Sequence, residues 1–157
     1  MTKGAKVLGD VRAVSYELEI PIDASPERTW SVLTEETNAW WPTHFHVLGE
    51  DSTVALEMEP GGRFVETKPD GTSLIWFRVE SIEAGKSLSV AGYLFPKWGG
   101  PATTLVVFSV EPREGGSLVR VSDSLFGHVP DSSIESLTSG WIDLFQNGLA
   151  PYAARVN

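Results

Sequence analysis

The sequence contains no cysteine, and its 12 Lys and Arg residues are outnumbered by 21 Asp and Glu residues, which gives a formal net charge of -9. The lack of cysteine excludes disulfides, thiolate metal ligands and cysteine nucleophiles. The shortage of basic side chains argues against a nucleic-acid partner, because phosphate contacts need clustered Lys and Arg. It gives no support for docking on an anionic membrane surface either.

Long hydrophobic runs are also lacking. No segment approaches membrane-spanning length, and residues 1–11 lack the apolar run of a signal peptide. The 157 residues are 41% hydrophobic and 21% charged, which is typical of a globular chain of one-domain size. We therefore expect a single cytoplasmic domain, residues 1–157, that neither enters a membrane nor binds nucleic acid.

Residues 132–156 are predicted to form one long helix, because apolar residues recur there at every third or fourth position on one face. They are Ile134, Leu137, Trp141, Phe145, Leu149, Tyr152 and Val156. Ser132 and Glu135 have the spacing of a capping box at the helix start. Gly148 interrupts the apolar face and leaves either tight packing or open space, and Pro151 is expected to kink the last turn.

Strand patterns dominate the rest of the chain. Residues 14–22 alternate between apolar and polar, which is typical of a half-buried strand. A short helix at residues 26–34 is expected after Ser25 as its N-cap, and residues 38–42 form an aromatic turn or a second short helix. Further strands are predicted at residues 53–58, 63–68, 73–82, 87–95, 103–111 and 117–125. The short connections between them imply an antiparallel sheet and an α+β class.

Several short segments carry a resemblance to a known family. They are Ala24-Ser25-Pro26-Glu27-Arg28-Thr29-Trp30, Trp40-Trp41-Pro42, Pro60-Gly61-Gly62-Arg63-Phe64, Asp70-Gly71 before a Trp-bearing strand, and Gly140-Trp141 with Leu144 and Phe145. In their order and spacing the chain resembles the helix-grip fold of the START-like, or SRPBCC, superfamily. Within it, the chain looks most like the group named for the activator of heat-shock protein 90 ATPase.

The resemblance spans roughly residues 14–152. It implies a curved antiparallel sheet of about six to seven strands that grips the last helix, with two short helices after the first strand and an internal cavity. It does not imply one activity, because members include ligand carriers, cyclases, resistance proteins and co-chaperones.

The leading hypothesis is a protein that binds a small, hydrophobic and aromatic molecule in that cavity, without a cofactor. Six Trp residues are unevenly spread along the chain, and an aromatic lining suits a concave apolar site. The residues expected to line the cavity are Trp41, Phe64, Phe77, Phe95, Trp141 and Phe145. Trp98 is placed on a mobile lid loop, and Gly148 is expected to leave room beneath the helix.

A cyclase- or hydratase-like enzyme is the first alternative, with Asp123 or His128 as its acid or base. Asp123 shares a strand face with Val119, Val121 and Leu125, so it lies either inside the cavity or at a solvated rim. The serines on both sides of it favour the rim. A chaperone-interaction module is the second alternative, and self-association as a homodimer stays open.

His44 and His46 would project to the same side of an extended segment and are the candidate metal ligands, with His128 or Asp123 as a third. No second ligand pair lies at recognisable spacing, so we expect loop histidines and no metal site.

Three charged residues, Arg63, Glu66 and Arg78, are expected on the convex, solvated face of the sheet. One face of residues 73–82 should look inward, and the row of Ile75, Phe77 and Val79 is the apolar one. The opposite row holds Trp76 and Arg78, and the sequence leaves the position of Trp76 unresolved.

Overall fold

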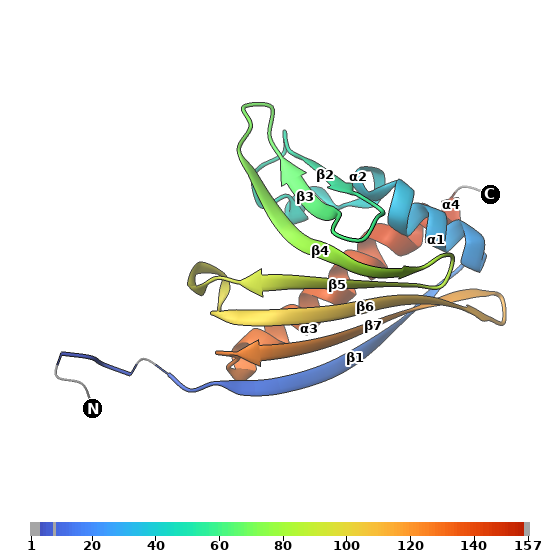
Figure 1. Ribbon diagram of the computed structural model, residues 1–157. Coiled ribbons are helices and arrows are strands. Elements are labelled where there is room, and N and C mark those ends of the chain that lie inside the picture. The colour runs from blue at the N-terminus through green and yellow to red at the C-terminus, as the bar shows by residue number, and fades with distance from the viewer. Residues whose placement is uncertain (1–3, 8, 156–157) are drawn as a thin grey trace.

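The computed structural model describes residues 4–7 and 9–155, and its main element is one antiparallel sheet in the order β1-β7-β6-β5-β4-β3-β2 (Figure 1). The strands are β1 (Arg12–Ile22), β2 (Thr53–Leu56), β3 (Arg63–Thr67), β4 (Ser73–Glu83), β5 (Ser87–Leu94), β6 (Ala102–Arg113) and β7 (Gly116–Gly127). The helices are α1 (Pro26–Glu35), α2 (Thr37–Trp40), α3 (Asp131–Leu144) and α4 (Ala150–Arg155). Shorter turns are η1 (Thr43–Phe45), η2 (Pro96–Trp98) and the π-helical η3 (Phe145–Leu149). The predicted α+β fold is confirmed.

The curved sheet holds the C-terminal helix against one face (Figure 1). α3 crosses that face, and α1 packs near the C-terminal end of the chain against α2, α4 and the strands β6 and β7. The hydrophobic core fills the space between the helices and the inner face of the sheet, as expected for two packed layers. Within the described part of the chain, no helix has the length and apolar character needed to span a membrane.

The C-terminal helix follows the predicted apolar face, with Phe145 and Leu149 almost fully buried. It is not one regular helix, however, because the widened turn η3 separates α3 from α4. Pro151 has no N–H to donate to the carbonyl four residues earlier, and the widened turn ends two residues before it, at Leu149. Val156 lies outside the described residues.

The predicted capping box is wrong. α3 begins at Asp131 with Pro130 at the N-cap position and no side-chain cap bond, so Ser132 is already inside the first turn. Pro130 fixes an extended backbone immediately before the helix, so the N-cap lies two residues before the predicted Ser132. The other predicted cap is confirmed, since the Ser25 hydroxyl accepts the Arg28 backbone N–H at 3.1 Å.

A bulge in β4 decides which side chains face the helix. Phe64 pairs with Phe77, but its neighbour Val65 pairs with Ile75, so Trp76 is an extra residue opposite β3. A bulge of this kind changes which face the following side chains occupy. Phe77 therefore faces the core, whereas Ile75 is 41% exposed.

The three mid-strand charges do not share one face of the sheet. Arg63 and Arg78 are exposed, as predicted. Glu66 is 0% exposed, so its predicted position on the solvated face is wrong. It alternates with Phe64 on β3 and shares the inner face with it, next to Leu74 on β4.

Candidate functional site

A cavity of about 290 Å³ lies between the inner face of the sheet and α3. Its walls come from α3, from the strands β4, β5, β6 and β7, from η2, and from the segment that follows α2. Most of the lining side chains are apolar, and many are aromatic. The aromatic ones are Trp41, Phe45, Trp76, Phe77, Tyr93, Trp98 and Trp141.

The aromatic side chains support each other. Trp41 and Trp76 meet with ring centroids 5.5 Å apart, and Phe77 stacks on Trp141 at 6.1 Å. Phe64 lies 5.2 Å from Trp41 and Phe145 lies 5.9 Å from Trp141. Because aromatic pairs at such distances attract each other, the wall is held in one arrangement.

The aromatic residues that the sequence placed around a cavity do not all reach it. Trp41, Phe77, Trp98 and Trp141 lie on its wall. Phe64 and Phe145 are buried one layer behind, around a second space of only about 10 Å³. Phe95 is 59% exposed and packs edge-on against Trp98 without lining the cavity. The role of these residues in binding stays a prediction.

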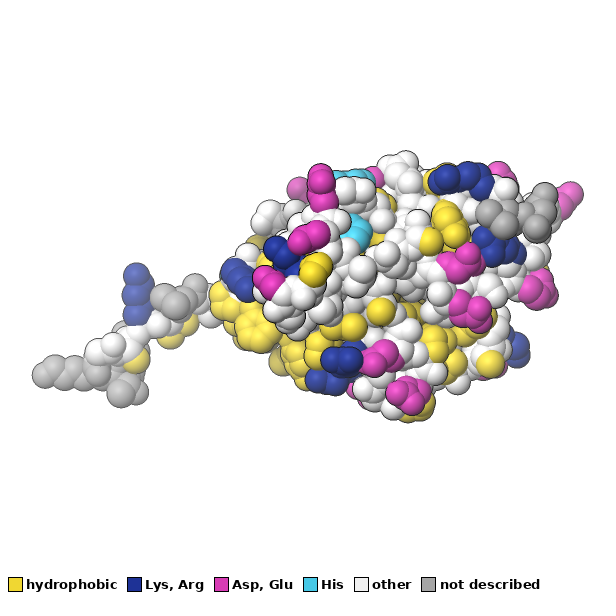
Figure 2. All heavy atoms as spheres, turned by 90° about the horizontal axis from the view of Figure 1, so that it is seen from above, with side chains coloured by type: hydrophobic (Ala, Val, Ile, Leu, Met, Phe, Trp, Pro, Cys, Tyr) yellow, Lys and Arg dark blue, Asp and Glu magenta, His cyan; other side chains and the backbone are white. Residues whose placement is uncertain are grey.

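The mouth of the cavity is formed by exposed apolar side chains, here called the apolar rim: Val47, Ile75, Tyr93 and Trp98. They belong to four different segments, namely the chain before β2, the start of β4, the end of β5, and η2 in the β5–β6 connection. Figure 2 shows hydrophobic side chains gathered at this end of the body, on the left of the view. The Lys97 ammonium lies 4.6 Å from the centre of the Trp98 ring.

Two glycines of the C-terminal helix have opposite surroundings, which corrects one prediction. A Cβ at Gly148 would lie 2.9 Å from both the Pro42 side chain and the Trp40 carbonyl oxygen, so Gly148 allows tight packing rather than open space. Gly140 lines the cavity, and a Cβ there would meet nothing within 4 Å. The space beneath the helix is therefore at Gly140, a position that the sequence reading missed.

Asp123 is 2% exposed and lines the cavity, so its predicted position at a solvated rim is wrong. Its carboxylate accepts hydrogen bonds from the Tyr16 hydroxyl, with an O–O distance of 2.6 Å, and from the Thr104 hydroxyl, with an O–O distance of 2.5 Å. We call these three residues the Asp123 cluster. The strands β1 and β6 flank β7 and supply the two donors, one for each carboxylate oxygen.

Within this cluster, Tyr16 has a shifted pKa. Burial raises the pKa of the Tyr16 hydroxyl well above its usual range, and the hydrogen bond to Asp123 and the charge of that carboxylate raise it further. Tyr16 therefore stays a neutral donor at any physiological pH. The indole N–H of Trp141 is also buried and has no hydrogen-bond partner among the described residues.

The three histidines lie apart from the cavity. η1 is a helical turn, so His44 and His46 do not project together as in an extended segment. His44 pairs with Asp143 at 2.8 Å, and His46 contacts the Ser52 hydroxyl at 2.8 Å. His128 is half-buried beside the end of β7. Within residues 4–7 and 9–155, no group of three His, Cys, Asp or Glu residues could hold a metal ion.

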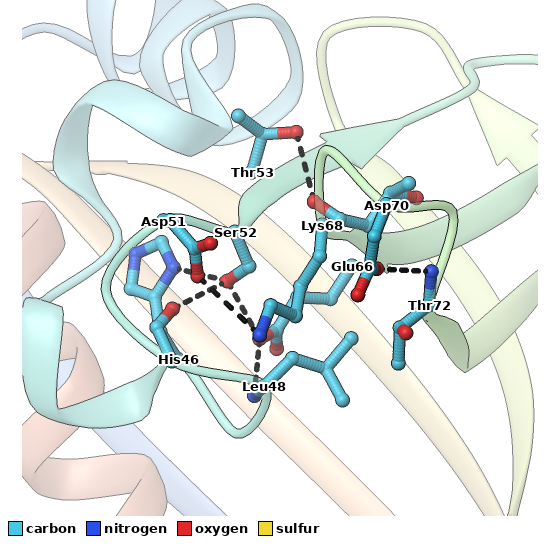
Figure 3. Close-up of polar contacts among 11 residues, drawn as sticks. His46, Leu48, Asp51, Ser52, Thr53, Glu66, Lys68, Asp70 and Thr72 are labelled. Carbon is cyan, nitrogen blue, oxygen red and sulfur yellow. Dashed lines mark hydrogen bonds and ion pairs between the residues drawn. The ribbon is translucent and has the colours of Figure 1, made fainter.

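Glu66 fixes the segment that forms one side of the mouth (Figure 3). Its carboxylate accepts the backbone N–H of Leu48 at 2.7 Å, that of Val47 at 3.3 Å and the Ser52 hydroxyl at 2.8 Å. It also accepts the indole N–H of Trp76 at 3.1 Å. One buried carboxylate thus connects two residues of the cavity wall, Val47 and Trp76.

The comparisons with known proteins agree with this architecture. The fold belongs to the helix-grip class of the SRPBCC superfamily, as the sequence resemblance predicted. Residues 23–154 match the family described as activator of Hsp90 ATPase homolog 1-like protein, and the chain belongs to that family. None of the curated proteins matches the sequence.

Solved structures resemble the chain over most of its length at low identity. Protein MLL2253 from Mesorhizobium loti is 22% identical with a TM-score of 0.65, over 92% of this chain and 99% of that one. Ara h 8.0201 is 13% identical with a TM-score of 0.66, over 92% and 100%. DynU16, from the dynemicin biosynthetic locus, is 19% identical with a TM-score of 0.64, over 88% and 46%. At these identities the likeness concerns the fold alone.

Proposed function

We propose that this protein binds a small, largely apolar and aromatic molecule in the cavity between the sheet and α3. The observation that carries the proposal is a cavity of about 290 Å³ with aromatic side chains on several of its walls. This volume is near the lower end of the range for small-molecule pockets, about 300–1,000 Å³. A ligand of one or two fused rings would fill it, and the apolar rim would pack against whatever part of the ligand reaches the mouth.

Fluorescence titration with N-phenyl-1-naphthylamine, a neutral probe that brightens in apolar surroundings, tests the proposal. We expect saturable binding to the wild-type protein and loss of binding in Gly140→Leu, because the new side chain would project into the cavity. Ser139→Leu adds the same side chain at the exposed neighbouring position of α3 and should bind the probe normally. An absence of saturable binding to the wild type, or equal binding by all three proteins, would contradict the proposal.

An enzyme that transfers a proton within the cavity is the second candidate, and one observation favours it. Asp123 lines the cavity instead of facing solvent, so it could reach a bound substrate as acid or base. His128 does not line the cavity, which leaves Asp123 as the group to test. Contact with a chaperone stays a prediction that rests on the family alone.

Hydrogen–deuterium exchange at the carbon next to the carbonyl of 2-tetralone would test proton transfer. An enzyme of this kind should accelerate the exchange in deuterated buffer, and Asp123→Asn should abolish the acceleration. If bound 2-tetralone exchanges no faster than the free ketone, the catalytic candidate is wrong and the binding proposal still stands.

A further inference from the structure

Asp123 is the only acidic or basic side chain, other than the phenol of Tyr93, among the described residues that line the cavity. The other polar side chains on the wall, besides the indoles, are the hydroxyls of Thr104 and Ser136. A carboxylate in such an apolar setting is costly unless it is paired and hydrogen-bonded. The chemistry around Asp123 therefore bears on which ligands the cavity accepts.

The hydrogen-bond partners of Asp123 are both neutral. Tyr16 and Thr104 each donate one hydroxyl proton, one to each carboxylate oxygen. Each oxygen of a carboxylate can accept more than one hydrogen bond, so acceptor capacity remains. Among the described residues, no Lys, Arg or His lines the cavity to neutralise the charge.

We infer that Asp123 selects the ligand's polar group: the cavity takes an aromatic molecule that carries one protonated amine and discriminates against aromatic anions. This inference rests on the binding function proposed above and adds the class of ligand. An ammonium group would donate to the carboxylate and supply the missing positive charge, whereas a ligand carboxylate would face a like charge across an apolar wall.

The aromatic wall favours the same class of ligand. The faces of indole and phenyl rings attract cations, most strongly where water is excluded. Trp76, Phe77 and Trp141 line the same cavity as Asp123, so a cation held at the carboxylate would share an apolar cavity with aromatic rings. The net charge of -9 also favours the approach of cations over anions.

Three naphthalenes that differ only in one substituent test the inference by isothermal titration. They are 1-naphthylmethylammonium, 1-ethylnaphthalene and 1-naphthylacetate. We expect the ammonium to bind the wild-type protein more tightly than the ethyl compound by roughly tenfold or more, the value of one charge-assisted hydrogen bond. The acetate should bind more weakly than either.

Asp123→Asn should remove the preference for the ammonium and still bind 1-ethylnaphthalene, and that retained binding shows that the variant is folded. Glu135→Gln removes the same charge from an exposed position of α3 and should keep the preference, which separates local from net charge.

The outcomes distinguish the two proposals. If 1-ethylnaphthalene binds but the ammonium binds no tighter, or if the preference survives in Asp123→Asn, the selection by Asp123 is wrong and the binding function stands. If none of the three compounds binds the wild-type protein, the binding function itself is wrong. The comparison of the three compounds on the wild type decides the matter even if Asp123→Asn does not fold.

Discussion

Two glycines, eight residues apart on the C-terminal helix, have different physical roles. Gly148 lets the helix approach the backbone carbonyl of Trp40, and Pro42 packs onto it. Gly140 faces open space within the cavity. Gly in a helix is less favourable than Ala by about 1 kcal/mol, so each glycine needs a structural or functional reason.

Alanine at the two positions should therefore have effects of opposite sign. Gly140→Ala should raise the free energy of unfolding by up to about 1 kcal/mol, since it gains helix propensity without a clash. Gly148→Ala should lower it by about 1–3 kcal/mol, because the methyl group would push against backbone. Urea denaturation midpoints measure both effects, and a loss of stability in Gly140→Ala would contradict the assignment of open space there.

The raised pKa of Tyr16 predicts how stability depends on pH. The hydroxyl has a higher pKa in the folded protein than in the unfolded chain, where its value is about 10. The folded state therefore holds this proton more tightly, and the stability it contributes is present below pH 10 and is lost as the pH rises above it.

Tyr16→Phe should accordingly show a smaller loss of stability between about pH 10 and 12 than the wild-type protein, once the difference at pH 7 has been subtracted. The exposed Tyr93 offers the matched control, and Tyr93→Phe should follow the wild-type curve. Chemical denaturation at a series of pH values provides the measurement. Parallel curves for Tyr16→Phe and wild type would show that the buried hydroxyl does not contribute.

At the level of the elements, the bulge in β4 and the segment before β2 form one unit. The bulge at Trp76 changes the inward face of β4, and Glu66 on β3 then binds the indole of Trp76 and the backbone of Val47 and Leu48. The apolar rim depends on this unit, because Val47 belongs to it and Ile75 adjoins Trp76.

Glu66→Gln should lower the free energy of unfolding by about 1–3 kcal/mol. The amide NH₂ would replace one carboxylate oxygen and would face N–H or O–H groups that now donate hydrogen bonds to that oxygen. Glu80→Gln, at an exposed position of β4, is the matched control and should leave stability nearly unchanged. Thermal and urea denaturation measure the difference. Equal stability of the two variants would mean that the buried contacts of Glu66 add little.

The elements were largely predictable because their signals are local. Alternation along the chain predicted the strands, and the spacing of Phe145 and Leu149 predicted the buried helix face. Glu66 was misplaced because the donors that satisfy its buried carboxylate come from other segments, namely the backbone of Val47 and Leu48 and the indole of Trp76. The bulge at Trp76 could not be predicted either, because it arises from the pairing of two strands. The predicted capping box is wrong because Pro130 occupies the N-cap position, so Ser132 already lies within the helix.

For the whole molecule, the sequence predicted the fold class and the family but only part of the cavity wall. Trp41, Trp98 and Trp141 come from distant segments that meet only in the folded chain. Asp123 was placed at a rim because its donors, Tyr16 and Thr104, lie on other strands and cannot be recognised from β7 alone. Alternation predicted which strand face Asp123 occupies, but the serines on both sides of it suggested a solvated position.

The most direct test of the central claim is a two-dimensional ¹H–¹⁵N spectrum of the tryptophan indoles during titration with 1-ethylnaphthalene. The chain has six Trp residues, and four of them line the cavity: Trp41, Trp76, Trp98 and Trp141. Trp30, on α1, does not line it. A ligand in the cavity predicts saturable shifts that are large for those four signals and smallest for Trp30. Shifts spread evenly over all six signals, shifts concentrated at Trp30, or no shifts at all would contradict the account.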